Sequence, residues 1–183
     1  MSIARLIRQS SVFVTQLELS LPTVEHGLEL ARRFHVPTIL NPAPATELPD
    51  RFYPLCDYLT PNESEAAGLI GQPVSDLDDA ERAAGALLAR GVRNVVITLG
   101  AQGVLVKNAR VTEHVAAFDA GPVVETTGAG DAFNGGFAIG LSEGMDIVDA
   151  ARFGCAVAGI SVTRYGTAPS MPARSEVDRF MQR

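Results

Sequence analysis

The sequence predicts an α/β fold, a three-layer αβα sandwich around a mainly parallel sheet. Short runs rich in β-branched residues alternate along the chain with stretches of helical periodicity, which is typical of βαβ units. Residues 95–99 are apolar except for Thr98, as expected for a strand that is covered on both faces. No internal repeat or linker interrupts this pattern, so we expect one domain over residues 1–183.

The first half of the chain supplies three predicted strands, at residues 11–17, 37–40 and 58–60. Helices are expected over residues 22–34, where Pro22 suits the first turn, and over about 63–70. A further helix is expected between Ser75, a candidate cap, and Gly91, which follows its last turn. Acidic residues at the start of this helix favour its positive end.

The second half begins with the strand at 95–99, followed by a turn at 101–103 and a strand at 104–106. Val123 and Val124 form a strand-like pair before a glycine-rich turn. Two helices are expected after Asp131, one reaching about residue 143 and one from 147 to about 163. A short last helix is expected at 175–181.

Composition limits the classes of function. The net charge is −6 and apolar residues make up 46% of the chain, so neither a nucleic-acid partner nor disorder is expected. No apolar run approaches the roughly 20 residues needed to cross a bilayer, and the start does not resemble a signal peptide. We therefore expect a cytoplasmic protein without a membrane partner.

Cysteine and histidine usage gives no sign of a metal site. Cys56 and Cys155 lie far apart in apolar surroundings, which favours two buried free thiols over a disulfide. The three histidines show no metal-ligand spacing and are interpreted as surface or loop residues.

Three loops that follow predicted strands are rich in Gly, Asn, Thr and Pro. They comprise residues 41–44, 60–65 and 126–131. Ligands of open α/β sheets bind beyond the carboxyl ends of the strands. We therefore expect the loops at Asn62, Gly100 and Gly128 to meet along one edge of the sheet.

The strongest chemical signal is the segment VVETTGAGDAFNGG at residues 123–136. Gly128 and Gly130 allow close approach of a ligand, and free N–H groups at a helix start favour an anion. Asp131 at that start is suited to accept a proton from an attacking hydroxyl. The alternative is a tight turn with Asp131 as a helix cap. The segment is neither a P-loop nor a complete dinucleotide fingerprint, because Phe133 occupies the last glycine position.

The segment TGAGDAF at 127–133 resembles the C-terminal signature of the ribokinase (PfkB) family of carbohydrate kinases. Four other segments are similar to parts of that family and occur in its order: NPAPA at 41–45, TPNESE at 60–65, ITLGAQG at 97–103 and TRYGTAPSMP at 163–172. The resemblance covers nearly the whole chain and implies a ribokinase-like fold.

The resemblance also implies roles for individual residues. Asp131 would be the base that activates a sugar hydroxyl, and Gly128, Ala129 and Gly130 would form the anion hole. Glu18 matches an acidic sugar contact, although a lone glutamate after a strand is more often solvated.

For the nucleotide, the resemblance assigns residues from three segments. Asn62 and Glu65 would organise phosphate, Mg²⁺ and water, with a helix cap and a first-turn charge as the alternative. The nucleotide itself would be lined by Thr98, Gly100, Ala101, Gln102 and Gly103, with a β-turn as the alternative. Cys155 falls where ribokinases contact adenine, but a packed helix thiol explains it equally well.

Ribokinases also hold a monovalent cation, K⁺, near the anion hole. The matching positions, several of which would act through backbone oxygens, are Glu125, Thr127, Ser161, Arg164, Gly166 and Ser170. The family usually has Asp where this chain has Glu125. The extra methylene moves the carboxylate outward and is expected to affect cation binding or selectivity.

The implied activity is ATP-dependent phosphorylation of a sugar hydroxyl, with ribose favoured by the segments at 41–45 and 163–172. The alternatives are another sugar or nucleoside, or a non-catalytic nucleotide-binding or partner-binding remnant. The chain begins near the middle of the family pattern, so we expect a fold truncated at the N-terminus. The missing part would carry the lid and most sugar contacts, so little ribose phosphorylation by this chain alone and a weakened homodimer are expected.

Overall fold

The computed structural model describes residues 2–182. The chain divides into two compact units. Unit 1 comprises Met1–Thr98 and Leu105–Glu113, and unit 2 comprises Leu99–Val104 and His114–Arg183. Among the described residues, no helix is long and apolar enough to cross a membrane.

Unit 1 is built on a sheet whose strands follow one another in chain order. Within residues 2–182 the sheet holds six strands: β1 (Phe13–Thr15), β2 (Thr38–Leu40), β3 (Tyr58–Leu59), β4 (Asn94–Thr98), β5 (Val104–Asn108) and β6 (Thr112–Val115). The pairs β1–β2, β2–β3 and β3–β4 are parallel, which confirms the predicted mainly parallel sheet. Val95, Val96 and Ile97 of β4 are all fully buried, as predicted for a strand that is covered on both faces.

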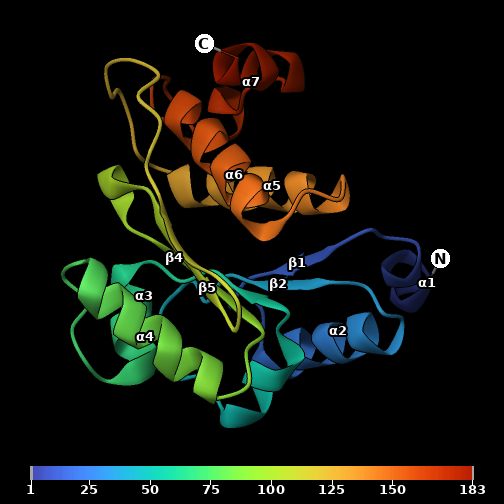
Figure 1. Cartoon of the computed structure of the whole chain (residues 1–183). Coiled ribbons are helices and arrows are strands. Elements are labelled where there is room, and N and C mark those ends of the chain that lie inside the picture. The colour runs from blue at the N-terminus through green and yellow to red at the C-terminus, as the bar shows by residue number, and fades with distance from the viewer. Residues whose placement is uncertain (1, 183) are drawn as a thin grey trace. The chain divides into compact units, whose positions relative to one another are not determined.

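The helices of unit 1 are α1 (Ile3–Arg8), α2 (Leu21–Arg33), α3 (Glu63–Ile70) and α4 (Leu77–Ala89), with a 3₁₀ helix, η1 (Asp50–Leu55). Helices α2, α3 and α4 lie on the same side of the strands (Figure 1). Pro22 lies in the first turn of α2, as predicted. Val24, Leu28 and Ala31 line the buried face of this helix, because residues spaced by three or four positions share one helix face.

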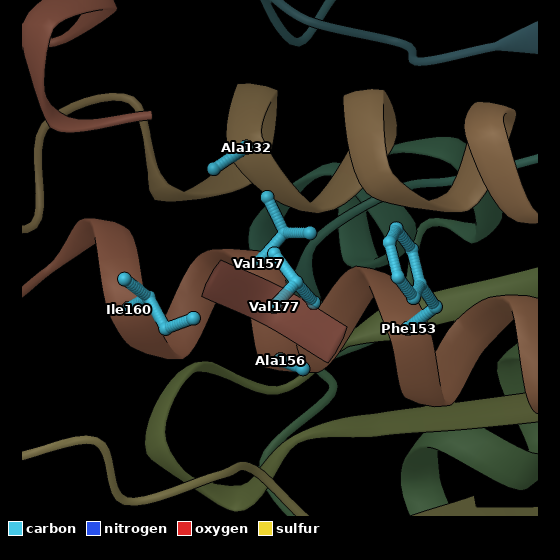
Figure 2. Packing of buried hydrophobic residues seen from close by; sticks show 6 residues of the cluster. All are labelled: Ala132, Phe153, Ala156, Val157, Ile160 and Val177. Atoms are coloured by element: carbon cyan, nitrogen blue, oxygen red, sulfur yellow. The ribbon is translucent and has the colours of Figure 1, made fainter. Parts of the chain in front are cut away.

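Unit 2 is mainly helical, with α5 (Ala129–Ser142), α6 (Ile147–Ser161) and α7 (Arg174–Met181) and the 3₁₀ turns η2 (Gly100–Gln102) and η3 (Ala168–Ser170). Its core is a cluster of apolar side chains from the three helices, which Figure 2 shows: Ala132, Phe153, Ala156, Val157, Ile160 and Val177. Glycines allow α5 and α6 to approach closely, since a Cβ on Gly136 would lie 2.8 Å from a methyl of Val157 and 2.9 Å from Cα of Gly154.

Two local predictions were wrong. Asp76, not Ser75, caps α4: its carboxylate accepts a hydrogen bond from the N–H of Asp79. The N–H of Ser75 instead donates to the Asp79 carboxylate. Val123 and Val124 form no strand; both are exposed, and the N–H of Val124 donates to the carbonyl of Val162 at 2.7 Å.

Candidate functional site

The N-terminus of α5 is open. Gly128 occupies the cap position in the left-handed region, at φ 81°, and no side chain caps the helix. Helices α1, α2 and α7 also lack a side-chain cap, whereas Asn62, Asp76 and Asp146 cap α3, α4 and α6 with their own side chains. The alternative that Asp131 is the cap is therefore wrong, since Asp131 is the third residue inside the helix and is exposed.

Gly130 is not required by the fold. Its φ is not positive, and a Cβ built on it would meet nothing within 4 Å beyond its own helix. Glycine is a weaker helix former than alanine, and neither backbone geometry nor packing explains its presence here. Close approach of a ligand to the helix start is a physical reason for a glycine at this position.

Glu125 ties the segment before the glycine-rich turn to the loop after α6. Its Oε2 accepts a hydrogen bond from the N–H of Gly166 at 2.8 Å. This bond, followed by one from the Thr127 side chain, holds the pKa of Glu125 below its ordinary value. Gly128 lies against Thr167, the residue after Gly166 in this loop. A Cβ placed on Gly128 would lie 3.2 Å from the methyl group of Thr167.

In unit 1, Asn62 and Glu65 form a reciprocal capping box. Asn62 Oδ1 accepts from the N–H of Glu65 at 2.8 Å, and the N–H of Asn62 donates to Glu65 Oε2 at 2.9 Å. Burial raises the pKa of Glu65, and the Asn62 N–H partly offsets this shift. The alternative interpretation of these two residues, a helix cap and a first-turn acid, is therefore confirmed as local structure. Asn62 also forms a parallel bridge with Thr98, so the ends of β3 and β4 lie together.

The ends of β1, β2 and β3 are joined by amide side chains. Gln16 Nε2 donates to Asn41 Oδ1 at 3.0 Å, and Asn41 Nδ2 donates to the Thr60 carbonyl at 2.9 Å. Asn41 is buried, while Glu18 is exposed. Sequence reasoning missed Gln16. Its polar side chain near the end of the strand predicted over residues 11–17 was the available signal.

The loop that follows β4 forms a tight turn. A turn was the alternative to nucleotide contact in the sequence analysis of this loop. Gly100 and Gly103 have φ of 53° and 94°, and a Cβ on Gly103 would lie 2.1 Å from the carbonyl oxygen of Val115. Ala101 and Gln102 are exposed. Nε2 of His114 lies 2.6 Å from the Gln102 carbonyl oxygen. His114 was predicted only as a surface or loop residue, so its contact with this loop was missed.

Both cysteines are free and buried, as predicted. Burial raises the pKa of Cys56 and of Cys155 to about 12, so both thiols are protonated at neutral pH. For Cys155, within α6, burial favours the packed thiol over an adenine contact. All three histidines are exposed, and residues 2–182 contain no group of three or more His, Cys, Asp or Glu suited to hold a metal ion.

The structure thus brings together two sets of the predicted residues. Asn62, Glu65 and Thr98 lie together in unit 1. In unit 2, Glu125 joins the loop at Gly166, and this loop lies against the turn that precedes Asp131. That the loops at Asn62, Gly100 and Gly128 share one edge stays a prediction.

Comparison with known proteins gives a match over nearly the whole chain. The family model "pfkB family carbohydrate kinase" matches residues 3–174. The chain is 42% identical over 176 residues to the ribokinase of Haemophilus influenzae, a match of 96% of this chain and 57% of that protein. It is 35% identical to the deoxyribokinase of Salmonella typhi, with the same two shares covered.

Solved structures agree with this fold. The crystal structure of ribokinase from Thermotoga maritima matches with a TM-score of 0.88 at 38% identity. The structure of Arabidopsis thaliana ribokinase complexed with ribose and ATP matches with a TM-score of 0.95 at 28% identity. Both matches cover 100% of this chain and 60% of the solved chain. The predicted ribokinase-like α/β fold is confirmed, and the chain spans somewhat over half the length of these relatives. It belongs to the pfkB family of carbohydrate kinases.

Proposed function

We propose that this chain is one nucleotide-binding and catalytic domain of a kinase that transfers a phosphoryl group from ATP to a sugar hydroxyl. The open N-terminus of α5 carries the proposal: it combines an uncapped helix end, a glycine that the fold does not require and an exposed carboxylate, Asp131. Free N–H groups at a helix start stabilise an anion, and a carboxylate beside them can take a proton from an attacking hydroxyl.

D-Ribose, phosphorylated to D-ribose 5-phosphate, is the favoured substrate. The support is the similarity to ribokinases of several organisms, among them Haemophilus influenzae and Schizosaccharomyces pombe. The similarity to a deoxyribokinase makes 2-deoxyribose the competing sugar. Glu18 is the proposed contact of this chain with the sugar. The cytoplasm is the proposed location of the protein.

ATP is the proposed phosphoryl donor, with Mg²⁺ to neutralise charge on its phosphates. Asn62 Oδ1 and Glu65 Oε2 already accept hydrogen bonds in the capping box. These residues therefore fit a role through bound water, which Mg²⁺ usually retains in protein sites, rather than direct ligation. The loop Gly100–Gln102 with Gly103 is the proposed nucleotide contact. A monovalent cation at the loop after α6 stays a prediction.

The test uses a hybrid in which this chain is joined to the part of the Haemophilus influenzae ribokinase that the match does not cover. In that hybrid, Asp131→Asn is expected to lower the turnover number at least 100-fold, the scale of losing a positioned base. ATP affinity should change much less. Turnover is measured as ADP release together with direct detection of ribose 5-phosphate.

Asp149 provides a matched control. It is the third residue of α6, as Asp131 is of α5, and it is also exposed. Asp149→Asn removes a similar charge from a similar place on a helix dipole and should leave turnover within about twofold, since the helix-dipole effect is small. Near-normal turnover in both variants would remove Asp131 from the mechanism.

A further inference from the structure

The loop between α6 and α7 is attached to the segment before the glycine-rich turn through both backbone and side chain. The N–H groups of Val124 and Glu125 both donate to the carbonyl of Val162, at 2.7 and 3.1 Å. The Glu125 carboxylate then receives the N–H of Gly166 at 2.8 Å. Because these contacts lie on both sides of residues 163–165, they fix the course of the loop.

The same loop supports the glycine-rich turn. A Cβ on Gly128 would lie 3.2 and 3.3 Å from two side-chain carbons of Thr167, so the turn and the loop pack against each other without room for a larger residue. The loop is closed further by Ser170, which is buried and donates its hydroxyl to the Thr167 carbonyl at 2.7 Å. Any shift of Gly166 would therefore be felt at Gly128, the cap of α5.

The donor set around Glu125 fits a cation poorly. A bound cation requires oxygen atoms that converge on it, whereas the Glu125 carboxylate faces donors, the N–H of Gly166 and the Thr127 side chain. The Ser161 carbonyl already accepts the N–H of Arg164 at 3.2 Å.

The side chains at the other predicted cation positions have protein partners as well. The Ser161 hydroxyl donates to the Ala158 carbonyl at 2.8 Å. The Arg164 guanidinium pairs with Glu176 of α7. At Glu125 itself, the N–H of Gly166 and the Thr127 side chain meet the carboxylate charge that a cation would otherwise neutralise.

We infer that Glu125 is a positioning residue whose hydrogen bond from Gly166 holds the loop behind Gly128, so that the glycine-rich turn keeps its shape without a bound monovalent cation. The inference rests on the proposed function only where it concerns nucleotide affinity. Glu125 acts through Gly166 and Thr167 and touches no reacting group. The consequence is a kinase domain whose nucleotide site is indifferent to K⁺.

The first test is independent of nucleotide. Amide hydrogen exchange of the unaltered chain is followed for peptides covering residues 126–131 and 163–170, in KCl and in choline chloride at equal ionic strength. Protection should agree within twofold between the two salts. In Glu125→Ala, protection of both peptides should fall at least tenfold. Glu125→Gln keeps an acceptor for the Gly166 N–H and should restore most of it.

The control variant is Glu143→Ala. Glu143 is also a glutamate of unit 2, but its partner is Arg174. This variant should leave both peptides protected within twofold. A tenfold or greater gain in protection on adding K⁺ to the unaltered chain would overturn the inference, as would full protection in Glu125→Ala.

The second test is the affinity for ADP with Mg²⁺ in the same two salts. Dissociation constants should agree within twofold for the unaltered chain and rise at least tenfold in Glu125→Ala. Absence of ADP binding with salt-independent protection would contradict the proposed function while supporting the positioning role. Tenfold tighter binding in KCl would contradict the positioning role while supporting nucleotide binding.

Discussion

At the scale of single residues, two polar caps show how one chemistry serves different ends. Asn62 and Asp76 each accept the N–H of a residue three positions later, both at 2.8 Å, and each begins a helix of unit 1. Only Asn62 lies at the carboxyl end of a strand beside Thr98. Ligands in α/β folds bind at such ends, so loss of the two caps should have different consequences for binding.

Replacing either cap with alanine should lower the free energy of unfolding by about 1 kcal/mol, the usual value of an N-cap. Asn62→Ala should also weaken binding of ADP with Mg²⁺, whereas Asp76→Ala should not. Urea unfolding and calorimetric titration of the two variants measure these effects. Equal ADP affinity in both would leave Asn62 as a cap alone.

The buried thiols make stability depend on alkaline pH. The pKa of Cys56 and of Cys155 is raised to about 12 in the folded chain, chiefly by burial, while an unfolded thiol ionises near 8.5–9. A raised pKa contributes stability that is present below the unfolded value and is lost as pH rises above it. Each thiol should therefore cost about 1–2 kcal/mol of stability at pH 10 relative to pH 8.

This expectation is checked by urea unfolding between pH 8 and pH 10. A double variant, Cys56→Ala with Cys155→Ala, should show a smaller loss over the same range. An identical slope in the variant would mean that other groups, such as the buried Tyr53, carry the pH dependence.

At the scale of elements, the sequence predicted best those helices whose start and end are both marked by characteristic residues. Helix α3 was predicted at its observed bounds because Asn62 caps it and Gly71 ends it in the left-handed region. Strand β6 was missed because three of its four residues are exposed and alternation is absent. Val123 and Val124 were wrongly predicted as a strand, since β-branched residues raise strand propensity without supplying a partner strand.

The candidate site was predictable where the residue type itself indicates the local structure. It was less predictable where contacts between residues distant in sequence determine the structure. The open turn at Gly128–Gly130 was visible in the sequence because glycines mark it. The contacts of Gln16 with Asn41 and of His114 with Gln102 join residues distant in sequence, and no local pattern announces such pairs.

The contact between α5 and α6 gives a sharp test of packing. A Cβ on Gly136 would lie 2.8 Å from Val157 and 2.9 Å from Gly154, whereas one on Gly135 would meet nothing within 4 Å beyond its own helix. Gly135→Ala should stabilise the chain by about 0.5–1 kcal/mol through helix propensity. Gly136→Ala should destabilise it by about 1–2 kcal/mol, because overpacking outweighs that gain.

Thermal unfolding of the two variants measures both effects, with opposite shifts in melting temperature expected. Stabilisation by both substitutions would show that α5 and α6 do not pack closely at Gly136.

At the scale of the whole molecule, the chain matches its relatives across nearly its full length while covering 57% of the Haemophilus influenzae ribokinase. Its two units carry different parts of the proposed chemistry. Unit 1 holds the capping box and the strand ends, and unit 2 holds the open helix start, Asp131 and the loop tied by Glu125. Nucleotide binding is the proposed role of both sets of residues.

Calorimetric titration with ADP and Mg²⁺ is the direct test of whether the chain binds nucleotide at the start of α5. The sample must first show cooperative thermal unfolding, which establishes that it is folded. We predict saturable binding to one site, weakened at least tenfold in Gly130→Val, which places side-chain bulk at the open start of α5, and unchanged in Gly135→Ala. Absence of binding to the folded chain would contradict nucleotide binding by this domain. Equal affinity of Gly130→Val and the unaltered chain would contradict a site at the start of α5.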